Sequence, residues 1–238
     1  MYKEKKGIFT EIQQKFLEYA ASPYAGIDGG DENAEYWFVG MEWSSRADFA
    51  ESYEKWQQQA ENPYSKNVDI TKGSWVFEEK LQDIYRRLPH TVCDKMIFAE
   101  GSNSFKLNLF PLSFNTDDEK KNWANDATAQ KTGFANFKAY QQAVVSARQK
   151  LFTELLKLNR KEKTIFCFGT GYSEYFATAF DIAESDFAEQ TARLSGNRRF
   201  YVAAAKNPLI KKIILCPFPR YAFNDKDIEK ISSIMIGV

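Results

Sequence analysis

The chain has 238 residues, and its 32 lysines and arginines are balanced by 32 aspartates and glutamates. This length suits one large domain that buries a core on both faces of a sheet. The balanced charge excludes a general electrostatic attraction to nucleic acid, so any such contact requires a local basic patch.

The sequence indicates neither a membrane anchor nor a metal site. No apolar run approaches the roughly 20 residues needed to span a bilayer, and the charged residues 1–7 precede an amphipathic pattern and not the apolar core of a signal peptide. Cys93, Cys167 and Cys216 are isolated and lack the spacing of a zinc site or a disulfide framework. We therefore expect a cytoplasmic, reduced protein that holds no metal and no other cofactor.

The first half of the chain predicts two helices and a short buried strand. Apolar residues at helical spacing predict a helix over 8–20, and residues 36–39 are apolar throughout, as in a strand covered on both faces. A second helix is expected over 77–88, where Pro89 ends it. The polar residues 44–74 are interpreted as a long insertion after the strand.

The second half of the chain predicts strands and helices in alternation. Strands are expected at 107–110, 164–168, 200–203 and 212–215. The longest helix is expected over 137–158, and further helices follow Gly171 and close the chain.

The alternation of strands and helices indicates an α/β fold. Such spacing requires βα crossovers, which produce a three-layer α/β/α sandwich with a largely parallel central sheet. No linker or repeat divides the chain, so we expect residues 1–238 to form one domain with polar insertions near 44–74 and 112–133. Ligands of open α/β sheets bind outside the carboxyl ends of the strands, so the candidate site residues belong in the loops that begin there.

Three short segments at the predicted strand ends carry the candidate chemistry. They are Gly40-Met41-Glu42-Trp43, Asn108 with its flanking leucines, and Cys216-Pro217-Phe218-Pro219. Their order and their positions resemble the motifs of the uracil-DNA glycosylase superfamily. The resemblance implies the fold of that superfamily and a pocket for a nucleobase, a nucleotide or DNA.

The resemblance also implies roles for Glu42 and Asn108. In the family, a Gly, a variable residue and an acidic or amide residue end the first strand, and the last of these positions or activates the attacking water. Glu42 stands in that frame, without the Pro that usually follows it. Asn108 matches the family's Asn, whose amide hydrogen-bonds the edge of an extruded base. The alternatives are a surface glutamate and a core amide bonded to neighbouring backbone.

The third segment departs from the family motif. Where the family has His-Pro-Ser, this chain has Cys216-Pro217-Phe218, and its one histidine, His90, lies elsewhere in the sequence. The family's His stabilises the charge that develops on the departing base. Arg220 is our candidate to replace it electrostatically, and a contact with a phosphate is the alternative role for this arginine.

Two tryptophans are the candidates for stacking on a base that has left the duplex. Trp43 follows Glu42, and Trp75 stands where it can equally be the first buried residue of its helix. The expected substrate-binding set is therefore Gly40, Met41, Trp43, Trp75, Asn108, Cys216, Pro217 and Phe218.

The sequence favours a nucleobase- or nucleotide-binding protein. It is either a weak or atypical DNA glycosylase, with Glu42 and Arg220 as catalytic residues, or a relative that binds nucleic acid without cleaving it. The missing His and Pro favour the second version. A non-enzymatic α/β module that binds another protein is the alternative, and the incomplete glycine pattern at 169–174 disfavours a dinucleotide cofactor.

Overall fold

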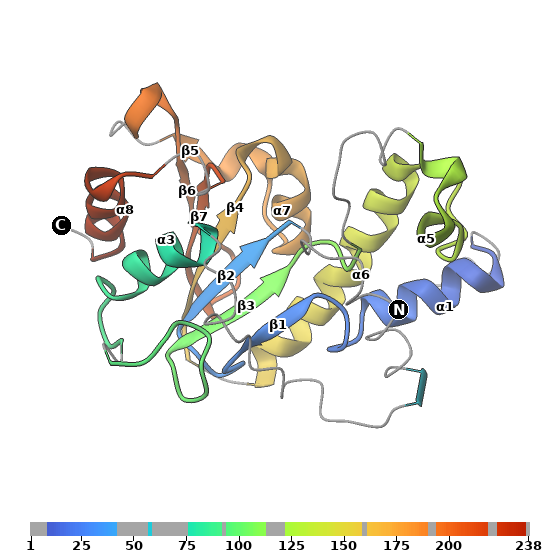
Figure 1. Cartoon of the computed structure of the whole chain (residues 1–238), viewed down its shortest axis with the longest axis horizontal. Helices are drawn as coiled ribbons and strands as arrows, with labels where there is room; N and C mark the ends of the chain where they lie inside the picture. Colours follow the sequence, from blue (N-terminus) through green and yellow to red (C-terminus); the bar gives the residue numbers. More distant parts are fainter. Residues whose placement is uncertain are drawn as a thin grey trace.

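A computed structural model describes residues 9–41, 57–58, 76–91, 94–112, 122–158, 161–189, 194–218 and 223–236. In this part of the chain a seven-stranded sheet lies between helices (Figure 1). The helices α3 (Val76–Tyr85) and α8 (Asp225–Ile236) lie on one side of the sheet, and α6 (Phe137–Leu158) and α7 (Ser173–Ala179) lie on the other. The predicted α/β class is confirmed.

The four central strands of the sheet run parallel. They are β3 (Ser104–Asn108), β2 (Tyr36–Gly40), β4 (Lys163–Phe168) and β7 (Ile210–Cys216), in that spatial order. Three outer strands pair antiparallel, namely β1 (Ile27–Gly30) on one side and β6 (Tyr201–Ala203) and β5 (Ala188–Glu189) on the other. The expectation of a largely parallel sheet therefore holds for its centre.

The strand order reverses at β2. The chain passes from β2 to β3 on one side, and β4 then pairs with β2 on its other side. In open α/β sheets a crevice forms at such a reversal, outside the carboxyl ends of the strands. The register brings these ends to one level, because Gly40 pairs with Asn108 and Phe168 pairs with Cys216.

The predicted helices form at the expected places. The helix α1 (Glu11–Ala20) begins with a capping box, in which Thr10 and Gln13 each bond the other's backbone N–H. The helix expected over 137–158 is α6, with the same bounds, and α1 lies against it. A short helix α5 (Ala127–Gln130) precedes α6 and was not predicted.

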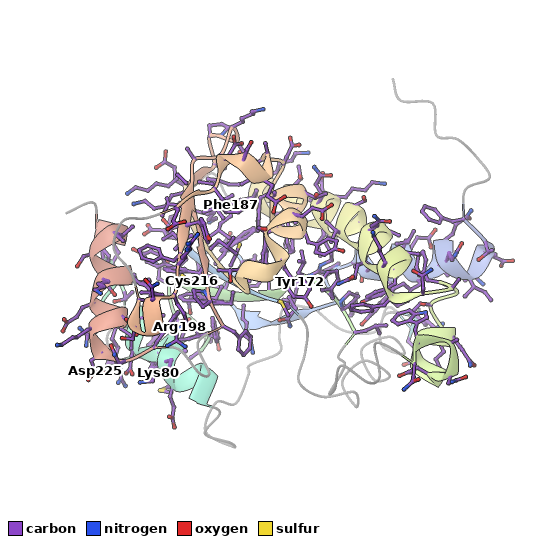
Figure 2. All side chains as sticks on the ribbon, turned by 90° about the horizontal axis from the view of Figure 1, so that it is seen from above. Lys80, Tyr172, Phe187, Arg198, Cys216 and Asp225 are labelled. Carbon is purple, nitrogen blue, oxygen red and sulfur yellow. The ribbon has the colours of Figure 1, made fainter. Side chains whose placement is uncertain are left out.

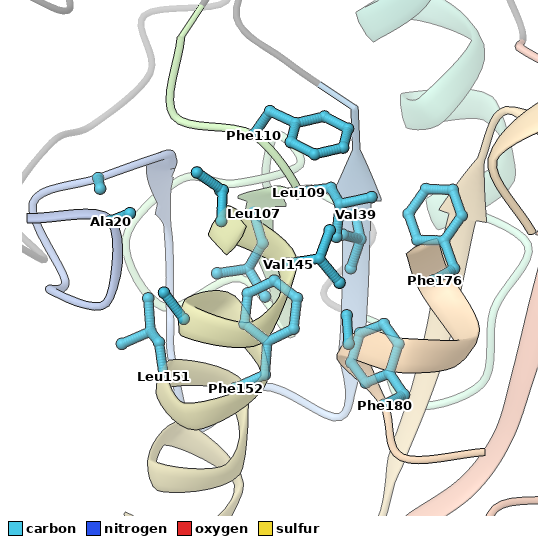
Figure 3. Close-up of a cluster of buried hydrophobic side chains, with 14 of the residues drawn as sticks. Ala20, Val39, Leu107, Leu109, Phe110, Val145, Leu151, Phe152, Phe176 and Phe180 are labelled. Atoms are coloured by element: carbon cyan, nitrogen blue, oxygen red, sulfur yellow. The ribbon is translucent and has the colours of Figure 1, made fainter. Parts of the chain in front are cut away.

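Side chains alternate between two apolar clusters on opposite faces of the sheet. Trp37 and Val39 of β2 join the larger cluster, which α1, α6 and α7 cover (Figure 3). Tyr36 and Phe38 join the smaller cluster, which α3 and α8 cover. Full burial of one such side chain stabilises the fold by roughly 1.5–3 kcal/mol, so both helical layers are held firmly on the sheet.

A fully buried arginine ties α1, β1 and β3 to α6. The Arg148 guanidinium donates hydrogen bonds to the backbone oxygens of Ala20 at 3.1 Å, Gly26 at 3.3 Å and Asn108 at 2.7 Å, and also to that of Ala25. Charge-assisted bonds of this kind are stronger than neutral ones. Arg148 therefore fixes the backbone at the carboxyl end of β3.

Two sequence predictions require correction here. The strand expected at 107–110 is β3 at Ser104–Asn108, so Asn108 is the last residue of its strand and not a central one. The strand β1 was not predicted at all, because Pro23 and the glycines between 26 and 30 indicate only the end of the preceding helix.

Candidate functional site

The residues at the carboxyl ends of β2, β3, β4 and β7 form what we call the carboxyl edge. The structure brings four of the predicted residues to this edge: Gly40 at the end of β2, Met41 immediately after it, Asn108 of β3 and Cys216 of β7. Two further hydrogen bonds extend the pairing beyond the strands, from Leu109 N to Gly40 O at 2.9 Å and from Phe110 N to Met41 O at 2.6 Å. The segments predicted to carry the chemistry of the first two motifs are therefore neighbours.

The Asn108 amide lies directly against Gly40. A Cβ placed on Gly40 would be 2.7 Å from Asn108 Oδ1, which is closer than real Cβ contacts. The glycines with positive φ in the described residues do not include Gly40. Gly40 is therefore needed for space and not for an unusual backbone conformation, and the space is occupied by the amide.

The position of Asn108 is fixed through its backbone. Its N–H donates to Gly26 O at 2.7 Å, and its carbonyl accepts from Arg148 Nη2 at 2.7 Å. The side chain is only 2% exposed. Strand alternation places it on the sheet face that α3 and α8 cover, because Phe105 and Leu107 belong to the opposite cluster.

A glycine-dependent turn closes the edge between β2 and β4. Gly169 has φ 123°, and a Cβ on it would be 2.7 Å from Met41 Sδ. Its N–H donates to Cys216 O at 2.8 Å. Only glycine adopts this backbone conformation at low cost. Because glycine also has no Cβ, the thioether of Met41 has room to lie against this turn.

An aromatic group borders Met41 on the α6 and α7 side. The ring centroid of Phe110 is 6.3 Å from that of Tyr172 and 5.7 Å from that of Tyr175. Tyr172 ends the short 3-10 helix η4 (Thr170–Tyr172), which follows Gly169. The sequence reasoning missed Tyr172. The signal that was available is an aromatic residue inside the glycine turn that follows a predicted strand.

Cys216 contributes backbone and not a thiol to the carboxyl edge. Its side chain is buried in the cluster under α3 and α8, and burial raises the pKa of the thiol far above its ordinary value. Pro217 is half-buried, whereas Phe218 is 40% exposed just beyond it. Cys216 can be located in Figure 2 together with Tyr172. The Cys216 carbonyl is engaged by Gly169, so of this segment Phe218 is the most exposed described residue.

Four predicted site residues lie outside the described residues. They are Glu42, Trp43, Trp75 and Arg220. The roles assigned to them remain predictions from the sequence. Of the predicted set, the structure therefore describes Gly40, Met41, Asn108, Cys216, Pro217 and Phe218.

The one histidine belongs to the opposite, amino edge of the sheet. His90 Nδ1 is 3.3 Å from Glu35 Oε2, and Glu35 immediately precedes β2. Lys163, the first residue of β4, is buried there, and its Nζ donates to Asn33 O at 2.9 Å. Burial, followed by the charge of Lys161, lowers the pKa of Lys163 to about 8. These groups organise the amino edge and leave the carboxyl edge without a histidine.

The described residues were also searched for groups that could hold a metal ion and for helices that could span a membrane. Among them, no group of three or more His, Cys, Asp or Glu side chains is arranged to hold a metal ion. No helix in the described ranges is long and apolar enough to cross a bilayer.

Comparison with protein-family models found no matching family, and comparisons with curated proteins and with solved structures found no significant match.

Proposed function

We propose that this protein binds a nucleobase or nucleotide at the carboxyl edge, and that Asn108 recognises the polar edge of the base. The observation that carries the proposal is the Asn108 amide held against Gly40 at the end of two paired parallel strands. An amide has both donors and an acceptor. It therefore suits the donor and acceptor pattern on a base edge.

The reversal of strand order at β2 supports this location. The edge residues of β2 and β4 flank the reversal, and Asn108 stands on the next strand. The same arrangement supports, as a proposal, a uracil-DNA glycosylase-like fold. The strands that carry the first two motifs, β2 and β3, are neighbours in the sheet, and β4 separates them from β7, which carries the third.

We further propose that binding outweighs cleavage. In an enzymatic version Glu42 positions the water, and Arg220 takes the place of the family's His toward the departing base. Removal of one preorganised donor typically lowers a rate by about 10²–10³. The single histidine lies at the amino edge, so any glycosidic cleavage is expected to be slow.

The experiment is a binding screen by isothermal titration calorimetry. Uracil, UMP, AMP, and single- and double-stranded oligonucleotides with and without uracil are titrated into wild type at low and moderate salt. Phosphate contacts weaken with salt, whereas base contacts persist. We expect one of these ligands to bind at both salt concentrations.

The matched variant is Asn108→Ala. We expect this variant to bind at least tenfold more weakly, because the polar edge of the bound base loses the amide that pairs with it. The melting temperature should change little. Absence of binding to every ligand would overturn the proposal. Unchanged affinity with a melting temperature several degrees lower would show that Asn108 is a core amide.

A further inference from the structure

Tyr172 is the aromatic side chain best placed to meet a ligand at the carboxyl edge. It lies three residues after Gly169, and its backbone N–H donates to Gly169 O at 3.0 Å. A Cβ on Gly169 would meet Met41 Sδ at 2.7 Å and Tyr172 Cδ2 at 3.8 Å. Met41, Gly169 and Tyr172 therefore form one continuous surface beside the strand reversal.

The Tyr172 ring is held in place but not covered. Its centroid lies 6.3 Å from that of Phe110 and 6.0 Å from that of Tyr175. Phe110 is buried, whereas Tyr172 is half-buried. A ring that neighbours hold in one position loses little conformational freedom on binding, and this favours affinity.

The hydroxyl groups of the two neighbouring tyrosines differ in their partners. Tyr175 donates to Gln141 Oε1 at 3.3 Å. Among the residues that the structure describes, none forms a hydrogen bond with the Tyr172 hydroxyl. Tyr175 is thus fixed within the protein, and the hydroxyl of Tyr172 is left for solvent or a ligand.

We infer that Tyr172 is a ligand-binding residue, which supplies the aromatic surface for the flat face of a heteroaromatic ring at the carboxyl edge. The inference rests on the proposed function and extends it to the second contact of the same ligand. Asn108 reaches the edge from the α3 and α8 side of the sheet, and Met41 and Tyr172 reach it from the α6 and α7 side.

This placement matches the chemistry of a base. A nucleobase has polar groups around its rim and apolar faces, so its rim can meet the Asn108 amide while one face meets the Tyr172 ring. Stacking of a base on an aromatic side chain changes affinity by about 5- to 100-fold on alanine substitution. This is the kind of contact that the sequence analysis expects of Trp43 or Trp75, which lie outside the described residues.

The experiment compares Tyr172 with its neighbour Tyr175. The affinities of wild type, Tyr172→Ala, Tyr172→Phe and Tyr175→Phe are measured by calorimetry for UMP and for AMP, and melting curves check that each variant is folded. We expect Tyr172→Ala to bind about 5- to 100-fold more weakly. Tyr172→Phe is expected to retain most of the affinity, since the ring remains, and Tyr175→Phe to bind as wild type.

The outcomes separate the two proposals. Wild-type binding that Asn108→Ala weakens and Tyr172→Ala leaves unchanged would overturn the role of Tyr172 alone. Weaker binding by Tyr175→Phe to the same degree as by Tyr172→Ala would also overturn it, because the effect would then come from general disturbance of the aromatic group. Absence of wild-type binding to both nucleotides would overturn both proposals.

Discussion

Substitution of Gly40 by alanine tests the contact on which the proposed site depends. The new Cβ would lie 2.7 Å from Asn108 Oδ1, while the next atoms, Asn108 Cγ and Leu107 O, are 3.9 Å away. Only the amide oxygen must move. The backbone at Gly40 accepts alanine, because its φ is not positive.

The expected cost of Gly40→Ala is small in stability. Displacing the amide from its preferred rotamer costs about 0.5–1.5 kcal/mol, and replacing glycine inside a strand returns roughly 0.5–1 kcal/mol. The free energy of unfolding should therefore fall by about 1 kcal/mol or less. For a chain of this size, the melting temperature should therefore fall by no more than about 2–4 °C.

The assay is a double-mutant cycle by thermal and urea unfolding. In an Asn108→Ala background the oxygen is gone, so Gly40→Ala should be neutral or stabilising. Gly171→Ala is the matched control, since no atom lies within 4 Å of its added Cβ. The reasoning is refuted if Gly40→Ala destabilises the Asn108→Ala protein as much as it destabilises wild type.

Three further predictions concern other parts of the structure. Arg148→Met should lower the free energy of unfolding by at least about 3 kcal/mol, because four buried carbonyls lose this donor at about 1–3 kcal/mol each where no other donor replaces it. Arg148→Lys should lower it less, and a loss below about 1 kcal/mol for Arg148→Met in urea unfolding would contradict this. Burial lowers the pKa of Lys163 to about 8 in the folded protein. Between this pH and the ordinary pKa of lysine, the unfolded state binds more protons than the folded state does, so the free energy of unfolding rises with pH. The free energy of unfolding of wild type should therefore rise by about 1–2 kcal/mol relative to that of Lys163→Met from pH 7.5 to 9.5, and a difference that is independent of pH would refute it. On oligonucleotides that contain uracil, wild type should excise the base very slowly and Glu42→Gln not at all; rapid wild-type turnover would contradict the dominance of binding, and equal activity of the two proteins would remove Glu42 from the mechanism.

The elements with an unambiguous apolar pattern were predictable from the sequence. The buried strand at 36–39 and the helix at 137–158 both form, because a continuous apolar run and a sustained helical period have few other solutions. The strand β3 was placed too late because Ser104 and Lys106 suggest exposure. Ser104 is in fact buried, and its hydroxyl accepts from Phe98 N at 2.8 Å.

Of the three outer strands, β6 was expected at 200–203, whereas β1 and β5 could not be predicted because their pairing is set over long distances. The strand β1 contains Gly29 and Gly30, which locally favour a turn, and it forms by antiparallel pairing with β3, far along the chain. Within the described ranges, the strand β5 has two residues and pairs with β6 alone. Local sequence carries little information about such pairing.

The positions of several candidate residues were predictable, whereas their roles stay predictions. Gly40 and Asn108 were identified at strand ends, and their direct contact supplies the physical reason for both residue types. Arg148 was missed, since a lone arginine on a helix is usually exposed, and its partners are carbonyls that no pattern of side chains reveals. Tyr172, for which we propose a stacking role, was not selected because the choice was based on tryptophans alone.

The side-chain amide resonance of Asn108 provides the most direct test of the central claim. It can be assigned in a ¹H–¹⁵N spectrum by its absence from Asn108→Ala, and then followed during titration of wild type with UMP and with a single-stranded oligonucleotide that contains uracil. Binding of a base edge by this amide predicts a shift that saturates with the same Kd as the calorimetric titration. Binding that leaves this resonance unmoved, or no binding of either ligand, would contradict the claim.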